Sequence, residues 1–528
     1  MTLLLCGLLL AACRKDCVVD FPETAHAVAL EASSVVIPEG GSATVLFRVE
    51  EGDFRFNYDV SSPGCQISLR LRDGGQPEQF RLAGISARGQ GLYEATLSDS
   101  GTSGAYSQEA CLALSFRSAA GMDIRICSGY ISVDCGDPQF GPAVDTGLPV
   151  IYINTADGRD VDSRSVEQQA VLKIKGAGEY EDMPQASCNI RGRGNITWKW
   201  SKKPYQVEFR DMVPMLGMPA ARRWVLLANF IDRTLMRNLV SMKVASLTSL
   251  EWTPRCVPVE VVLNGSHVGN YLLIEKVEVA PSRVEVTPEG GFLLESDFHF
   301  DNEVQWVDPH GISTHMAGIP FAVKYPKPED LDPDDLAYIK KYIYDTAETI
   351  YSDSFADPVS GYAAWIDVDS FIDYWIVFEL LSNQELGNPG SVFYHKSAGG
   401  KLVAGPCWDF DWGMLRIATS VQKRLGIVNR MALWYERLFR DPVFEEKVRN
   451  RYAELLPALE TIPDYIDGCE ALLKESARLN FAMWNPAEDR WQHQGMLING
   501  DENYSFGEAV ASLRRVYLDR LELLKDNL

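Results

Sequence analysis

The sequence predicts an α+β protein in which an all-β sandwich precedes a larger domain with a strand-rich part and a helical part. Two observations lead to this fold class. Short alternating segments separated by Gly, Ser and Pro run through the first quarter of the chain, and helical apolar periodicity is concentrated after about residue 326. Strands followed by helices are typical of α+β domains.

The bulk composition is that of a folded, acidic protein with more than one domain. At 528 residues the chain exceeds what one hydrophobic core usually spans, so we expect two or three domains. Hydrophobic residues make up 46% and charged residues 23%, which excludes a disordered chain. The formal charge of -23 argues against a nucleic-acid partner, because phosphate backbones need a basic surface.

The first element is a short apolar segment that begins at Met1 and is too brief to span a membrane. Its end, Leu10-Ala11-Ala12-Cys13, resembles a bacterial lipobox, in which the cysteine is diacylated. The segment lacks the usual Lys or Arg before the apolar run, and a buried N-terminal strand is the alternative. We expect residues 1–19 to be a lipoprotein signal peptide and tether. Lipidated Cys13 would then anchor the protein in the cell envelope, at the outer membrane or cell surface rather than the inner membrane.

The second element, residues 20–140, reads as an immunoglobulin-like β-sandwich. Alternating segments such as Ser34–Pro38, Ala43–Val49 and Gln66–Leu71 are separated by turn residues, as in such sandwiches. No catalytic group stands out there, so we expect a spacer or binding module. Five cysteines fall in or just before this region, and one or two disulfides are plausible in an oxidising compartment. They are Cys17, Cys65, Cys111, Cys127 and Cys135.

The third element begins after a turn-rich boundary near residue 140, and we assign residues 146–528 to one domain. Strands are expected from Leu148 to about residue 326. A helix then begins at Asp332-Pro333, which supplies an N-cap and a first-turn proline. Further helices are expected over Asp369–Ser382, Val443–Ala458, Asp467–Leu479 and Ser505–Lys525.

Two carboxylates, Asp409 and Asp411, follow the apolar segment Leu402–Ala404. On an extended backbone alternate side chains share a face, so both could approach one hard cation such as Mg²⁺. A surface acidic turn is the alternative. The flanking Trp408, Phe410 and Trp412 favour burial, where unpaired carboxylates are costly.

A polar loop precedes this pair and contains Asn383 and Glu385. It follows the Asp369–Ser382 helix and leads into a predicted hairpin of Val392–Lys396 and Lys401–Cys407. This order places an amide and a third carboxylate beside the aspartates. An acid in a loop is usually solvated, so spacing alone leaves the role of Glu385 open.

A basic segment lies in the strand-rich part. Between Ala186 and Leu239 there are ten basic residues against three acidic ones, although the whole chain is acidic. Arg191, Arg193, Lys202 and Lys203 stand at its beginning, in a setting that suits a polyanion. A solvated basic loop is the alternative.

In their order along the chain, these segments resemble the CotH (spore coat protein H-like) kinase family from about residue 148 to the C-terminus. The resemblance rests on the blocks Ile190–Asn195 with Lys202–Tyr205, Trp224–Leu227 with Asp232 and Arg237-Asn238, Val261–Gly265, Tyr271–Lys276, Gly290–Glu295, Lys324–Pro326 and Gly405–Gly413.

The resemblance implies a secreted atypical protein kinase with a two-lobed kinase-like fold that transfers the γ-phosphate of ATP to Ser or Thr hydroxyls of a protein acceptor. ATP and Mg²⁺ or Mn²⁺ would be its cofactors. Asp409 would bind the metal with Asp411 beside it, and Glu385 and Asn383 would form the catalytic loop. Arg191, Arg193 and Lys202 or Lys203 would contact the phosphates, and Glu275 would bridge the lobes.

One departure from the family pattern bears on activity. Glu385 stands where many members have Asp, and its extra methylene moves the carboxylate, to which catalysis is sensitive. Three alternatives to an ordinary kinase therefore remain. The protein is a slow kinase, it uses a different acceptor, or it is a pseudokinase that acts as a surface-binding or adhesion lipoprotein. A glycosidase is the weakest interpretation, because Asp409 and Asp411 are too close together for that chemistry.

Overall fold

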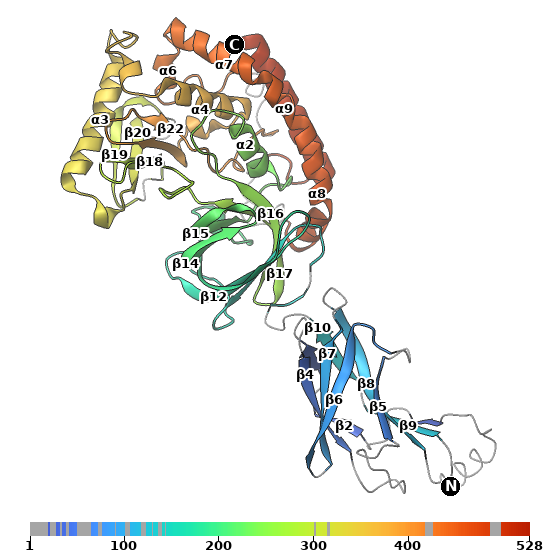
Figure 1. The fold of residues 1–528 in the computed structure, drawn as a ribbon. Helices are drawn as coiled ribbons and strands as arrows, with labels where there is room; N and C mark the ends of the chain where they lie inside the picture. Colours follow the sequence, from blue (N-terminus) through green and yellow to red (C-terminus); the bar gives the residue numbers. More distant parts are fainter. Residues whose placement is uncertain are drawn as a thin grey trace. The chain divides into compact units, whose positions relative to one another are not determined.

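The computed structural model describes residues 19–21, 28–31, 34–37, 42–49, 65–71, 76–89, 91–100, 106–117, 123–128, 130–135, 140–142, 144–299, 302–313, 317–417, 426–485 and 498–528. The chain divides into two compact units, Met1–Val144 and Asp145–Leu528. It is a mixed α+β protein whose N-terminal part is β-rich (Figure 1).

The N-terminal unit consists of strands in two sheets that share one hydrophobic core. One sheet has the order β1-β9-β8-β10-β3, with β5 also paired to β8, and the other has the order β2-β4-β7-β6. In β4, Val45, Phe47 and Val49 are buried and alternate with exposed residues, which is the two-residue period that the sequence predicted. The strands are β1 (Val19–Phe21), β2 (Val28–Leu30), β3 (Ser34–Ile37), β4 (Ser42–Val49), β5 (Cys65–Leu71), β6 (Phe80–Gly89), β7 (Leu92–Asp99), β8 (Tyr106–Arg117), β9 (Asp123–Cys127) and β10 (Ile131–Cys135).

The cysteines of this unit show no disulfide in the part that the structure describes. Cys111 and Cys127 are free thiols on the neighbouring strands β8 and β9, and they hydrogen-bond to each other. Cys17 lies outside the described residues, as do the side chains of Cys65 and Cys135. The predicted signal segment and Cys13 also lie outside them.

The second unit begins with a closed barrel, in the order β11-β12-β13-β14-β15-β17-β16. Its strands are β11 (Val150–Thr155), β12 (Gln168–Lys175), β13 (Met183–Gly192), β14 (Tyr205–Met215), β15 (Met218–Leu227), β16 (Cys256–Leu263) and β17 (Ser266–Glu275). A parallel pairing of β11 with β16, which puts Ile151 beside Val261, closes it. Buried side chains such as Leu172, Ile190 and Trp224 form a core of its own.

A five-stranded sheet follows, with the order β19-β20-β18-β21-β22. Its strands are β18 (Phe292–Ser296), β19 (Gln305–Ile312), β20 (Ala317–Tyr325), β21 (Val392–Lys396) and β22 (Val403–Ala404). The predicted hairpin is confirmed, because β21 and β22 pair with Tyr394 beside Ala404. Since β21 also pairs with β18, this sheet joins the strand-rich part to the helical part, which the sequence treated as separate.

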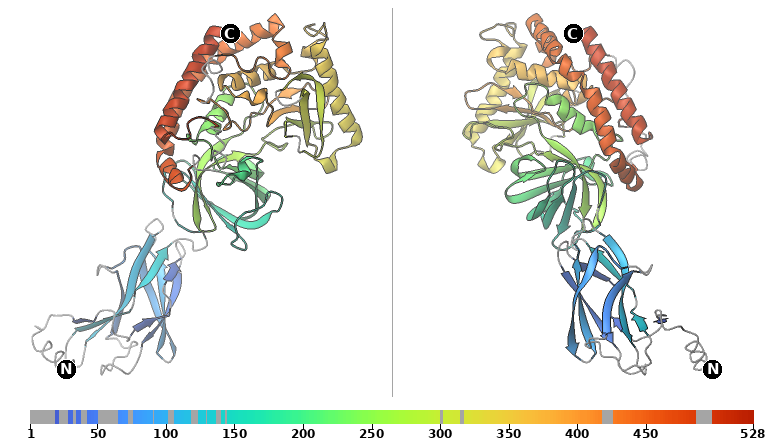
Figure 2. Two further views of the ribbon diagram at one scale, coloured as in Figure 1. Left: turned by 180° about the vertical axis from the view of Figure 1, so that it is seen from behind. Right: turned by 45° about the vertical axis from the view of Figure 1, so that its right-hand side comes forward.

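Helices cover the rest of the unit, and α8 and α9 lie side by side along it (Figure 2). They are η1 (Thr197–Lys199), α2 (Arg237–Ala245), η2 (Pro328–Asp330), α3 (Pro333–Tyr351), η3 (Tyr362–Ala364), α4 (Val368–Leu380), η4 (Gln384–Leu386), α6 (Tyr435–Leu438), α7 (Pro442–Leu459), α8 (Ile462–Met483) and α9 (Phe506–Asn527). The predicted helix starts are confirmed at α3, where Asp332 accepts from the Asp334 N–H, and at α9, where Ser505 and Glu508 form a capping box.

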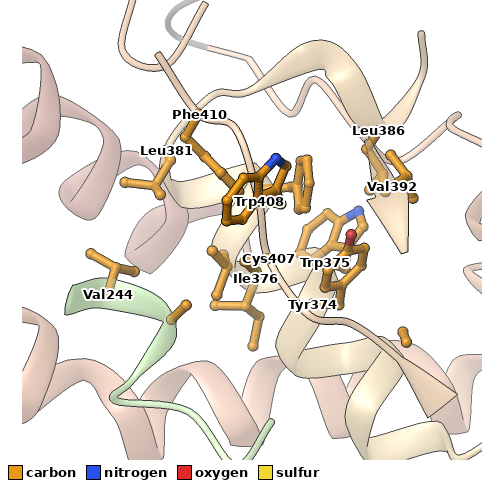
Figure 3. Close-up of a cluster of buried hydrophobic side chains, with 14 of the residues drawn as sticks. Val244, Tyr374, Trp375, Ile376, Leu381, Leu386, Val392, Cys407, Trp408 and Phe410 are labelled. Carbon is orange, nitrogen blue, oxygen red and sulfur yellow. The ribbon is translucent and has the colours of Figure 1, made fainter. Parts of the chain in front are cut away.

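The core of the helical part supports the segment that carries the two aspartates. Trp375 and Ile376 of α4 pack in one cluster with Cys407, Trp408 and Phe410 (Figure 3). Phe410 is fully buried, and replacing such a residue with Ala typically costs about 3–5 kcal/mol. Within the described residues, no helix combines the length and the apolar content that crossing a membrane requires.

Candidate functional site

A cavity of about 690 Å³ in the second unit gathers residues that are far apart in the sequence. Arg193 follows β13, Glu385 lies in η4 after α4, and Asp409 and Asp411 follow β22. The ends of β18 and β20 and the segment after β15 also line it. The structure therefore brings four of the predicted site residues into one polar cavity.

Asp409 and Asp411 meet at this cavity, although the backbone there is not the extended strand that the sequence predicted. β22 ends at Ala404, and Asp409 has φ 62°, in the left-handed region that Asn and Asp tolerate best among non-glycine residues. Burial raises the pKa of Asp411 well above its usual range, and repulsion by the neighbouring Asp409 carboxylate and the hydrogen bond that protonated Asp411 donates to it raise it further. Two carboxylates held this close repel each other unless a proton or a cation lies between them.

Asparagine side chains hold this segment in place. Asn238 of α2 accepts a hydrogen bond from the Phe410 N–H at 2.7 Å. Asn499 accepts from the Gly413 N–H at 3.2 Å and donates to the Asp411 carbonyl at 3.0 Å. Asn238 belongs to one of the family blocks, whereas no sequence signal pointed to Asn499.

Asn383 holds the Glu385 loop in place through hydrogen bonds. Its Oδ1 accepts from the Glu385 N–H at 2.8 Å, and its carbonyl accepts from the Asn429 side chain at 2.9 Å. Asn383 is fully buried and does not line the cavity, so it positions the loop. Burial raises the pKa of Glu385 well above its usual range, and the charges of Asp409, Asp411 and Asp297 add to this effect.

Arg193 is the one predicted basic residue that lines the cavity. Burial lowers the pKa of its guanidinium, while Asp409 and Asp411 act in the opposite direction. The guanidinium also lies over the Trp408 ring at 5.4 Å from the ring centre. It is therefore placed to meet an anionic ligand beside the aspartates.

Comparison with known families agrees with this geometry. Residues 190–524 match the family described as CotH kinase protein. The chain belongs to the CotH kinase family. The matched range contains the whole cavity, from Arg193 to Trp412.

Comparisons with other proteins add little to this family assignment. No curated protein matches the sequence. Solved structures with some likeness include the C-terminal domain of the AgI/II polypeptide BspA of Streptococcus agalactiae, at 9% identity and TM-score 0.12 over 28% of this chain and 61% of that one. Titin domains Z1Z2 in complex with telethonin match at 13% identity and TM-score 0.13, over 35% of this chain and 89% of that one. The Escherichia coli adhesin FdeC matches at 12% identity and TM-score 0.14, over 56% of this chain and 87% of that one. At these TM-scores none of the three defines the fold of this chain.

The other three predicted phosphate ligands of this CotH kinase do not line the cavity and bind other groups. Arg191 donates to the Arg164 carbonyl at 2.8 Å and lies 3.6 Å from Glu167. Lys203 donates to the Trp198 carbonyl at 2.8 Å. Lys202 is buried against α8, where it donates to the Asn480 side chain at 2.8 Å.

Glu275 likewise lies away from the cavity. It forms a salt bridge with Arg255 at 2.9 Å and accepts from the Arg255 N–H at 2.8 Å. It therefore joins the end of β17 to the residue just before β16, and it does not line the cavity. The lobe-bridging role expected from the family resemblance does not fit this placement.

The cavity also contains pairs that sequence reasoning left without a role. Lys324 of β20 forms a salt bridge with Glu295 of β18 at 2.8 Å and donates to Asn302 at 2.9 Å. Asp297 and His299 follow β18 in the same wall. Glu295 and Lys324 stood in the family blocks, but only the pairing of β18 with β20 brings them together.

The donor set of the cavity fits a divalent cation. Among the described residues no three His, Cys, Asp or Glu side chains are arranged as a complete metal site. Asp409 and Asp411, however, supply hard oxygen ligands, and a cation would replace the proton that their hydrogen bond requires. Mg²⁺ is commonly bound through one or two carboxylates with water and substrate phosphates as its other ligands.

Proposed function

We propose that this CotH kinase is an atypical protein kinase that transfers the γ-phosphate of ATP to Ser or Thr hydroxyls of an envelope or extracellular protein, with Mg²⁺ or Mn²⁺. The observation that carries the proposal is the convergence of Arg193, Glu385, Asp409 and Asp411 on one cavity of about 690 Å³. Phosphoryl transfer needs little more than positioned cations and a carboxylate beside the acceptor.

Each side chain has a defined task in this proposal. Arg193 and Lys324 attract the phosphates, and Asp409 and Asp411 would hold the metal ion, which when bound neutralises charge on the transferring group. Glu385 orients the acceptor hydroxyl. Asn383 keeps the Glu385 backbone in place, and the buried Trp408 and Phe410 keep the metal-binding segment rigid.

The charges of the cavity support a strict need for the divalent cation. Five carboxylates line it, those of Glu295, Asp297, Glu385, Asp409 and Asp411, against the two full cations Arg193 and Lys324. Binding of a nucleoside triphosphate without a metal ion would require carboxylates such as Glu385 and Asp411 to stay protonated, whereas a divalent cation at Asp409 and Asp411 would offset their negative charge. Calorimetry should detect ATP binding with Mg²⁺ and none with EDTA. Binding that is equal in both conditions would contradict this assignment.

Turnover is tested separately from binding, because Glu385 departs from the family pattern. Labelled ATP, Mg²⁺ or Mn²⁺ and candidate envelope proteins should give a labelled Ser or Thr. Metal-dependent ATP binding without transfer would favour a pseudokinase, and neither binding nor transfer would favour a surface-binding or adhesion protein.

We further propose that the N-terminal unit is an immunoglobulin-like sandwich, that the second unit works as a two-lobed kinase-like domain, and that lipidated Cys13 anchors both in the cell envelope. The two sheets with a common core support the first point, and the cavity between barrel and helical part supports the second. Only the lipobox motif of the sequence supports the anchor.

A further inference from the structure

An aspartate and a histidine form a dyad in the wall of the cavity, directly after β18. The Nδ1 of His299 lies 2.6 Å from Oδ1 of Asp297, and the same oxygen accepts from the His299 N–H at 2.9 Å. Asp297 is nearly buried, whereas His299 keeps 31% of its side chain exposed. Among the described residues no group bonds to Nε2 of His299. The carboxylate thus holds the ring by one nitrogen and leaves the other available.

A second pair of Asp and His two positions apart shows how the Asp297–His299 pair differs from an ordinary turn. Asp308 and His310 are also two positions apart, with Nδ1 3.1 Å from Oδ1. There, however, Nε2 of His310 forms an ion pair with Glu348 at 2.8 Å, and neither residue lines the cavity. An Asp–His pair at this spacing can therefore simply stabilise a turn of the backbone. His299 differs because its second nitrogen has no partner and its ring borders the cavity.

His299 borders the part of the cavity in which Glu385 lies. The Phe298 N–H donates to the Pro389 carbonyl at 2.7 Å, which ties the dyad to the loop that follows Glu385. A Cβ on Gly390 would lie 3.7 Å from the Phe298 ring and 3.9 Å from Oε1 of Glu385. The Phe298 and His299 rings stack at 4.2 Å. The other charged groups in this cavity are Glu295 with Lys324, Arg193, Asp409 and Asp411.

The environments of the two proton-accepting groups differ. Glu385 is enclosed beside the aspartates, and burial together with their charges raises its pKa well above its usual range. His299 keeps 31% of its side chain exposed, and its available nitrogen carries no charge in the neutral form. An imidazole that is oriented by a carboxylate and keeps its second nitrogen available matches the general-base arrangement of many enzymes.

We propose that His299, oriented by Asp297, accepts the proton of the acceptor hydroxyl during phosphoryl transfer. The inference rests on the proposed kinase function. The acceptor oxygen forms a bond to the γ-phosphorus while the bond from that phosphorus to the β-γ bridging oxygen breaks, and ADP leaves with the electron pair. The hydroxyl proton passes to Nε2 of His299, Asp297 stays ionised and holds Nδ1–H, and Glu385 orients the hydroxyl.

The test compares wild type with His299→Gln and with the matched control His310→Gln. Phosphotransfer from Mg-ATP to dephosphorylated casein is measured across pH. We expect His299→Gln to lower kcat by about 10²- to 10⁴-fold, to keep ATP affinity, and to lose the acidic limb of the wild-type profile. His310→Gln should keep wild-type kcat. Equal kcat and equal profiles for His299→Gln and wild type would overturn the proposal while leaving the kinase function intact.

Two further measurements separate proton transfer from other roles. His299→Ala should regain activity when imidazole is added, and a role in folding or packing would show no such rescue. If His299→Gln only raises the Mg²⁺ concentration needed, with its pH profile unchanged, His299 is a metal ligand and the proposal is wrong. Wild type that binds Mg-ATP but transfers nothing, with casein or with itself as acceptor, would overturn the proposed function and this inference together.

Discussion

Replacing Asp409 with Asn should make the metal-free protein more stable and at the same time prevent its stabilisation by Mg-ATP. Asn has nearly the same shape and, like Asp, tolerates the left-handed backbone that this position has at φ 62°. The substitution therefore removes one negative charge beside Asp411 and little else. In wild type the same carboxylate both repels Asp411 and would bind the metal ion. The variant loses both effects, and they change stability in opposite directions, so they can be measured separately.

The expected magnitude follows from the two carboxylates. Unit charges about 4 Å apart interact by about 4 kcal/mol at an effective dielectric of about 20. The raised pKa of Asp411 shows that a proton already relieves part of this repulsion. We therefore expect a gain of about 1–2 kcal/mol without metal, which is a rise of a few degrees in Tm. In wild type, Mg-ATP at about 100 times its Kd should add about 2.7 kcal/mol, and the variant should lack this gain.

Thermal unfolding in EDTA and in Mg-ATP measures both effects in one experiment. Wild type should be the less stable protein in EDTA and the more stable one in Mg-ATP. Asp308→Asn is a suitable control, because it removes a carboxylate that holds His310 outside the cavity. It should lower Tm in both buffers and leave the ligand-induced rise unchanged. An Asp409→Asn protein that is destabilised in EDTA and still responds to Mg-ATP would refute the reasoning.

Other predictions concern features outside the cavity. Burial lowers the pKa of Lys202 to about 7, so above that pH the unfolded chain binds a proton that the folded chain does not. Wild-type stability in urea should then rise between about pH 7 and pH 10 by up to about 1.4 kcal/mol per unit, whereas Lys202→Met should show no such rise. Oxidation should link Cys111 to Cys127, because their thiols are in contact, and peptide mapping without reductant would detect the pair. A protein that begins at Thr146 should unfold cooperatively and keep Mg-ATP binding, and loss of either would show that the second unit needs the first. Cys13→Ser should release the protein from membranes, and unchanged membrane attachment would disprove the lipobox assignment.

Local sequence determined the secondary structure of this protein well, because caps and periodicity act over a few residues. Asp332-Pro333 and Ser505 begin α3 and α9 as expected, and the alternation in β4 gives its buried face. The order of the motif blocks was also enough to identify the CotH kinase family. The pairing of Asp409 with Asp411 was predicted correctly, although its backbone was not.

Tertiary structure decided which side chains face the cavity. Of Arg191, Arg193, Lys202 and Lys203, which all belong to one basic segment, only Arg193 lines it. The direction of a strand side chain reverses with each residue, so register has to be known before a role can be assigned. Glu295 meets Lys324, and Asp297 with His299 reaches the loop after Glu385, only because β18 pairs with β20 on one side and with β21 on the other. Such pairings between segments about 30 to 100 residues apart depend on how the whole sheet packs, and no local pattern in the sequence encodes them.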